Sequence, residues 1–174
     1  MGTRRGTTLM LVGMCLHAGS ALGGQTVYQK PSEFIAEACG GKLPPARALR
    51  LTPARQARIR RLLGREYRPS TVRYWKSGPT TVVILDEIGK TEPITTGFVV
   101  ENGRLARVKI LIYRESHGSE VSRPSFMTQF RDARLRSDGR LDRRIDGIAG
   151  ATLSVRAVTK LARVALYLDQ VIPK

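Results

Sequence analysis

The sequence has few cysteines, few aromatic residues and few acidic residues. Its 174 residues include only two cysteines, which are too few for a disulfide framework and lack the paired Cys and His spacing of a zinc site. Aromatic residues make up 6%, so the basic segments lack the interleaved aromatic side chains typical of single-strand nucleic-acid binding. No stretch reaches the roughly 18 apolar residues of a membrane-spanning helix, which excludes a multi-pass membrane protein.

The sequence is rich in positive charge and otherwise has the composition of a globular protein. Lysine and arginine number 30 against 14 acidic residues, so the formal net charge is +16. An apolar fraction of 41%, with 17 glycines and 9 prolines, excludes collagen-like and wholly disordered chains. The length fits a single domain with a substantial core.

Residues 1–23 are predicted to be a signal peptide. They begin with an arginine pair, continue into the apolar stretch 9–22, and offer Ala21 and Gly23 as the small residues before a cleavage site. The alternative is an uncleaved signal anchor. We therefore expect a periplasmic or otherwise exported protein, with membrane association as an open alternative, a mature net charge of +14 and Cys39 as its one thiol.

Residues 24–65 are predicted to form an N-terminal helical segment. Ser32 is expected to cap a short first helix, and 42–48 has the composition of a linker. Thr52 followed by proline favours the start of a second helix, which Gly64 is expected to end. A lone cysteine near the end of the first helix is interpreted as a half-buried apolar residue, with a redox role as the alternative.

Residues 66–174 are predicted to form the main domain. Apolar and β-branched residues indicate four strands, at 72–75, 80–85, 95–100 and 105–113. Asn102-Gly103 between the last two is a strong hairpin signal. The fold class is therefore α+β, a mainly antiparallel twisted sheet of about four strands packed by helices.

The strands are followed by a long polar connection and a helix. Residues 114–145 are polar apart from a short helical segment at 126–130, and a connection of this length is either functional or disordered. Residues 153–168 predict an amphipathic helix with an apolar stripe at helical spacing, formed by Val158, Leu161, Ala162, Ala165 and Leu168.

The segment immediately before this helix has the composition of a phosphate site. Gly150 and Ala151 remove bulk, so that a ligand could approach the backbone closely. Thr152 lies at the helix start, where unpaired N–H groups and the positive end of the helix dipole favour a phosphate. The same residues are also compatible with plain helix capping.

The residues Asp146-x-x-Ala149-Gly150-Ala151-Thr152 resemble the flavin-attachment motif of the FMN-binding domain family. That family includes the C subunit of the sodium-translocating NADH:quinone reductase and the G subunit of its Rnf relatives, and the resemblance extends over roughly 75–168. Ala149 stands where the family usually has serine or threonine.

The resemblance implies a covalently bound FMN. In the family, an FAD:protein FMN transferase attaches FMN through a phosphoester to the last threonine of the motif, here Thr152, and needs the acid at Asp146. The cofactor-binding residues expected at the helix start are Asp146, Gly150, Ala151, Thr152 and Ser154.

The polar connection is expected to cover the flavin ring. Gly118 would permit close approach, Val121 and Phe126 would offer apolar cover, and Gln129 would bond the polar edge of the ring. Glu120 could contact the flavin or pair with a neighbouring arginine. A merely solvated connection is the alternative.

Two functions follow from these residues. An exported flavoprotein would carry electrons to a redox partner, either a cytochrome or a membrane quinone-linked subunit. No nucleophile–base pair suggests a second reaction, so an electron carrier is favoured over a stand-alone enzyme. The alternative is a flavin-free basic protein that binds an anionic polymer, a lipid surface or nucleic acid. Predicted export disfavours nucleic acid, and peripheral membrane association stays open.

Overall fold

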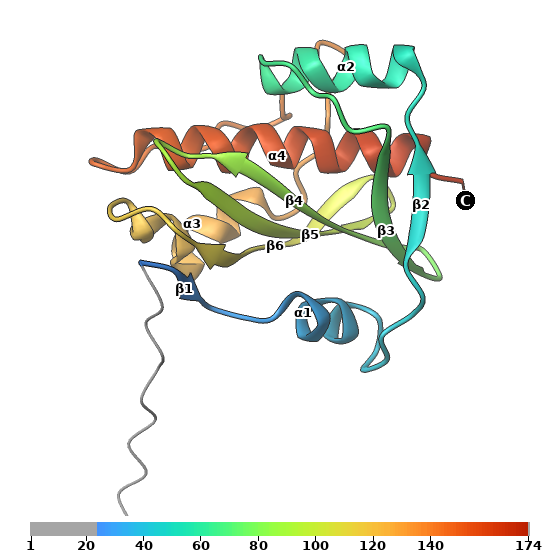
Figure 1. Cartoon of the computed structure of the whole chain (residues 1–174), viewed down its shortest axis with the longest axis horizontal. Helices are drawn as coiled ribbons and strands as arrows, with labels where there is room; N and C mark the ends of the chain where they lie inside the picture. The colour runs from blue at the N-terminus through green and yellow to red at the C-terminus, as the bar shows by residue number, and fades with distance from the viewer. Residues whose placement is uncertain (1–23, 174) are drawn as a thin grey trace, which may run out of the picture.

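A computed structural model describes residues 24–173 and shows an α+β fold built on one antiparallel sheet. The sheet has six strands in the order β1-β6-β5-β4-β3-β2. Helices α2 and α4 cover one face and helix α1 the other (Figure 1). The predicted signal peptide lies outside the described residues. None of the described helices is long and apolar enough to cross a membrane.

The elements follow one another along the chain with short connections as far as β6. They are β1 Thr26–Val27, α1 Pro31–Ala38, β2 Arg47–Arg50, α2 Pro53–Leu63, β3 Thr71–Ser77, β4 Thr80–Ile88, β5 Pro93–Glu101, β6 Arg104–Tyr113, the 3-10 turn η1 Ser119–Ser122, α3 Pro124–Met127, the 3-10 turn η2 Thr128–Phe130, and α4 Thr152–Val171. The helical segment expected at 126–130 is present as part of α3 and η2.

The four predicted strands are the central strands β3 to β6, but the expected count of four was too low. Asn102 and Gly103 form the predicted hairpin, with φ of 51° and 73°. The two additional strands, β1 and β2, are the sheet edges and belong to the segment 24–65 that was expected to be helical. Both are short, and most of their residues are exposed.

The predicted linker 42–48 was wrong at its C-terminal end. Arg47 already belongs to β2, whose pairing with β3 sets Leu49 opposite Val72. Only one residue of this strand is buried, so the sequence carries too little apolar alternation to reveal it. The strand is defined by its backbone pairing with β3 and not by its own apolar pattern.

The starts of the first two helices differ in how well the sequence predicted them. Thr52 caps α2 as expected, because its hydroxyl accepts a hydrogen bond from the Arg55 N–H at 3.3 Å. The expected cap at Ser32 is wrong, since α1 begins one residue earlier, at Pro31. Lys30 is the N-cap residue, and its side chain makes no capping hydrogen bond.

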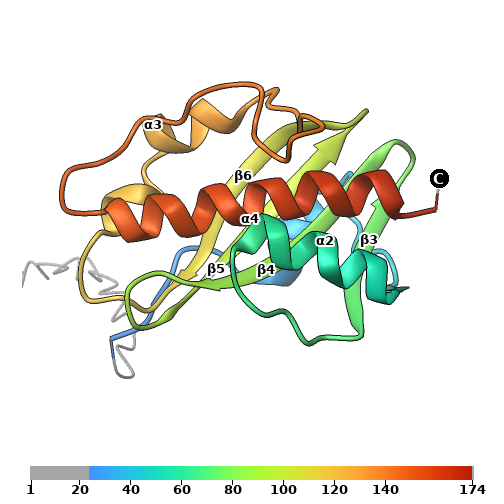
Figure 2. The same cartoon turned by 90° about the horizontal axis from the view of Figure 1, so that it is seen from above.

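Helix α4 forms the centre of the main hydrophobic core. The residues of its predicted stripe are all fully or almost fully buried, at 0–2% exposure. The helix lies across β4, β5 and β6, with α2 beside it (Figure 2). Ile59 and Leu63 of α2 are buried in the same core. The C-terminal helix is therefore the element that closes the fold, and its first turn is held at a fixed place above the sheet.

Helix α1 packs on the opposite face through Phe34, which is completely buried. Its ring lies against Gly97 of β5, where a Cβ atom would come within 2.5 Å of the ring. Arg107 lies over the ring, with its guanidinium 4.4 Å from the ring centroid, and pairs with Glu37. Cys39 follows this helix and is half-buried, and burial raises the pKa of its thiol.

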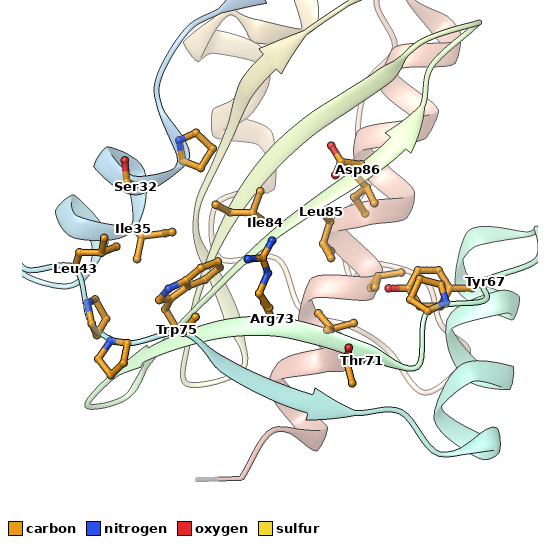
Figure 3. A pocket seen from close by; sticks show the side chains of 18 of the residues that line it. Ser32, Ile35, Leu43, Tyr67, Thr71, Arg73, Trp75, Ile84, Leu85 and Asp86 are labelled. Carbon is orange, nitrogen blue, oxygen red and sulfur yellow. The ribbon is translucent and has the colours of Figure 1, made fainter.

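The sheet splits between β3 and β4. These strands pair only between Tyr74–Ser77 and Thr80–Val83. Beyond that, 71–73 pairs with β2 alone and 84–88 with β5 alone. A cavity of about 1040 Å³ fills the gap, with Arg73, Trp75 and Ile84 around it (Figure 3).

A buried carboxylate fixes the turn between β4 and β5. The Glu115 side chain follows β6 and accepts hydrogen bonds from the backbone N–H groups of Lys90, Thr91 and Glu92, as well as from the Thr91 hydroxyl. Burial acts to raise the pKa of Glu115, but these hydrogen bonds outweigh it and hold the pKa below its usual value. The carboxylate therefore ties the end of β6 to the preceding hairpin.

We predict that Glu115→Gln lowers the free energy of unfolding by about 1–3 kcal/mol at neutral pH, because three backbone N–H groups lose a charged acceptor. The folded-state pKa is depressed, so the stabilisation is present above the unfolded-state pKa and is lost as the pH falls through the folded-state value. Urea unfolding between about pH 6 and pH 3 should therefore show a weaker acid destabilisation in the variant than in the wild type.

Glu92→Gln is the matched control, since this exposed side chain lies in the same turn and only its backbone N–H takes part. It should retain the wild-type pH profile. Equal stability and equal acid slopes for the Glu115 and Glu92 variants would contradict the assigned role.

Candidate functional site

The predicted attachment threonine is exposed at the first residue of α4. Thr152 follows the N-cap residue Ala151, which makes no side-chain capping hydrogen bond. The first backbone bond within the helix runs from the Val155 N–H to the Ala151 carbonyl at 3.0 Å. The N–H groups of the first turn therefore have no side-chain acceptor among the described residues. Together with the helix dipole, they favour an anionic group at this position.

A buried contact fixes this helix start against the loop that follows β6. The Tyr113 hydroxyl donates to the His117 carbonyl at 2.5 Å and lies 3.0 Å from the Ser154 hydroxyl. Gly118, with φ of 84°, fits against these groups, because a Cβ atom there would lie 3.0 Å from the Tyr113 oxygen and 3.3 Å from the Ala151 Cβ. Burial raises the pKa of Tyr113, so its hydroxyl stays protonated and remains a donor.

A small cavity lies between the polar connection and the motif. Its volume is about 200 Å³ and its walls are Glu120, Arg123, Ser125, Phe126, Gln129 and Ile148. This is below the range of about 300–1000 Å³ of pockets that enclose a whole ligand, so it fits one edge of a larger molecule. Ile148 is bound to the helix start through the hydrogen bond from the Ala151 N–H to its carbonyl, at 3.0 Å.

Gln129 joins the polar connection to the motif through a hydrogen bond. Its side-chain Oε1 accepts a hydrogen bond from the Asp146 N–H at 2.8 Å. The Asp146 carboxylate points to solvent with 79% of its side chain exposed, and the Arg144 guanidinium lies 3.7 Å away. An exposed carboxylate six residues before the threonine is accessible to another protein.

The structure therefore brings together three of the five residues predicted in the connection. Glu120, Phe126 and Gln129 line the small cavity. Val121 is fully buried in the core. Gly118 packs closely against residues of the chain itself, at Tyr113 and Ala151, and does not line the cavity. At the helix start, Asp146, Gly150 and Thr152 are exposed, whereas Ala151 and Ser154 are buried.

Sequence reasoning missed two residues of this cavity. Ile148 occupies an unspecified position of the motif, and its half-buried side chain gave no signal of its own. Arg123 was considered only as an ion-pair partner for nearby glutamates. Both lie in segments without regular periodicity, where only the folded chain shows which side chains share a wall.

The cavity between β3 and β4 is larger, but it lies far from the motif. The residues of α4 that reach it are Leu161 and Val164. Leu161 lies nine positions after Thr152, which is about 14 Å along the helix axis. The large cavity is therefore not adjacent to the attachment threonine, whereas the small cavity includes Ile148 of the motif.

The residues near the motif fit FMN. The helix start offers free N–H groups for a phosphate, and an aromatic and an aliphatic side chain, Phe126 and Ile148, line the adjoining cavity. Gln129 and Ser125 add polar groups to the same wall.

Comparison with protein families agrees with this fit. The model of the FMN-binding domain matches residues 89–167, from the turn after β4 to the last turns of α4. This match covers just under half of the chain, agrees with the resemblance of the motif, and supports an FMN-binding flavoprotein. A search of curated proteins found no match.

We predict that Gly118→Ala destabilises the fold by about 1–3 kcal/mol, because it combines a left-handed backbone with a Cβ atom placed against the Tyr113 hydroxyl and Ser154. Thermal unfolding measures the effect, and binding of free FMN should weaken with it. Gly41→Ala is the control, since Gly41 has nearly the same φ of 86° but open space at its Cβ position. Equal destabilisation by both variants would show that backbone strain alone is responsible.

Proposed function

We propose that this protein is an exported electron carrier whose FMN is attached through a phosphoester to Thr152. The observation that carries this proposal is the exposed threonine at the uncapped start of α4, within a chain segment that matches the FMN-binding domain. A covalent bond keeps the cofactor in place where no cytoplasmic pool can replace it.

Attachment requires an accessible hydroxyl and an accessible acid. Both Thr152 and Asp146 are exposed, and the segment between them is held to the domain by the Gln129 hydrogen bond. We propose that an FAD:protein FMN transferase docks here. The Thr152 oxygen forms a bond to the FMN phosphorus, the diphosphate bond of FAD breaks, AMP leaves, and the hydroxyl proton is released.

The small cavity is the proposed place for part of the flavin ring. Phe126 and Ile148 supply apolar contact, while Gln129 supplies a polar side chain beside them. Bound FMN supplies hydride or single-electron transfer, and the chain supplies binding and orientation. The proposed partner is a cytochrome or a membrane quinone-linked subunit, and the proposed location is the periplasm or another exported compartment.

We predict that the chain gains the mass of FMN minus one water when it is produced together with an active FAD:protein FMN transferase, and that Thr152→Val gains none. Intact mass spectrometry and in-gel flavin fluorescence measure both. Thr71→Val is the control, because Thr71 is also exposed but lies on β3, away from the motif. An unmodified wild-type chain beside a modified control substrate would contradict the proposed attachment.

We also predict that Asp146→Asn slows flavin attachment without changing the melting temperature. The exposed carboxylate has only the Arg144 contact at 3.7 Å, so its loss should cost little stability. A time course of mass gain, compared with wild type, measures the rate. An unchanged rate would remove Asp146 from the proposed role.

A further inference from the structure

A second concave surface lies between residues 140–145 and the part of α4 from Val155 to Arg163. Its volume is about 660 Å³. Six cationic side chains line it, namely Arg140, Arg143, Arg144, Arg156, Lys160 and Arg163, and no carboxylate is among its lining residues. We call this surface the basic groove.

The positive charge comes from both walls of the basic groove. Arg156, Lys160 and Arg163 are spaced four and three residues apart, so they share one face of α4. The other three cations come from the facing connection. Like charges that face one another across a groove repel, so the fold stores an unfavourable interaction that an anion would relieve.

Nearby carboxylates compensate only half of these cations. Arg143, Arg144 and Lys160 lie 3.6–3.7 Å from Asp142, Asp146 and Glu87, respectively. The guanidinium groups of Arg140, Arg156 and Arg163 have no carboxylate partner within the described chain, and Asp138 accepts a hydrogen bond only from the Arg140 backbone N–H.

Arg163 shows the lack of compensation best. It is half-buried, and its Nε donates only to the Thr159 carbonyl at 3.4 Å. Burial lowers the pKa of its guanidinium. A partly desolvated cation without a counter-charge is a favourable position for a carboxylate from outside the chain.

The floor of the basic groove is apolar. Leu141 and Val155 are buried at its base, and Ile145 is half-buried beside them. A simple polyanion would leave this floor uncovered, and a flat membrane surface would not enter a concavity. A peptide that carries both carboxylates and apolar side chains matches the rim and the floor together.

We propose that the basic groove binds an acidic segment of a partner protein, in which carboxylates alternate with apolar side chains. Arg156 lies one helical turn after Thr152, so a segment in the groove would lie next to the attached flavin. That this partner exchanges electrons with the flavin rests on the proposed function, whereas binding itself does not.

Binding is tested on the full, flavin-free chain with a short fluorescein-labelled peptide of alternating glutamate and leucine. Fluorescence anisotropy should show saturable binding that weakens as salt is added. The double variant Arg140→Glu and Arg156→Glu, at two residues without a described ion pair, should weaken binding by roughly tenfold or more. A peptide of glutamate alone should bind more weakly than the alternating peptide, because it leaves the floor uncovered.

The matched control is Arg61→Glu with Arg68→Glu. Both residues are exposed, lie on or after α2, and have no side-chain hydrogen bond or ion pair within residues 24–173. The net charge changes equally, so an equal loss of peptide binding would overturn the proposal in favour of unspecific attraction.

Two further outcomes would overturn the proposal. One is no binding of the alternating peptide at low salt. The other is preference for vesicles that contain phosphatidylglycerol over the peptide, which would assign the groove to lipid. Because the assay uses the flavin-free chain, its result is independent of whether Thr152 gains mass in the flavin-attachment experiment.

Discussion

The hydroxyl group of Tyr113 holds the functional part of this fold together. It lies at the end of β6 and bonds to the loop carbonyl of His117 and to the Ser154 hydroxyl in the first turn of α4. Gly118 fits closely against the same groups. A strand end, a loop and a helix start thus meet at one buried point. The position of Thr152 above the sheet depends on that point, since this residue is itself exposed and makes no capping contact.

The two concave surfaces near the helix start have different chemistry. Phe126 and Ile148 with Gln129 form a small mixed cavity suited to part of a flavin ring. The basic groove presents cations above an apolar floor. The proposed cofactor and the proposed partner segment therefore call on different residues, so that each can be tested without disturbing the other.

Much of the fold could be predicted because its signals are local. The apolar stripe of α4, the Asn102-Gly103 hairpin and the Thr52 cap all depend on residues close in sequence. The edge strands β1 and β2 could not be predicted, because their pairing partners lie far along the chain and their own residues are mostly exposed.

The site was predictable to a similar extent. Thr152 and Asp146 were predicted from their motif, and the structure leaves both exposed. The cavity wall at Ile148, the role of Tyr113 and the burial of Val121 depend on how an irregular connection folds back over the sheet. No periodicity in the sequence encodes that path.

The split between β3 and β4 separates a part of the sheet with short backbone pairing from a part with long backbone pairing. The β2–β3 pair is joined to the remaining strands by the short ladder from Tyr74 to Ser77 and, through the chain after α2, by the Arg65–Glu87 ion pair at 2.6 Å. Strands β5 and β6, by contrast, pair along nearly their whole length. The corner formed by β2, α2 and β3 is therefore held to the rest of the domain mainly by side-chain packing in the core that it shares with α4, and only secondarily by backbone pairing. Because Trp75 is the only tryptophan in the sequence and lies in the short ladder that joins β3 to β4, its fluorescence is a natural probe of that junction.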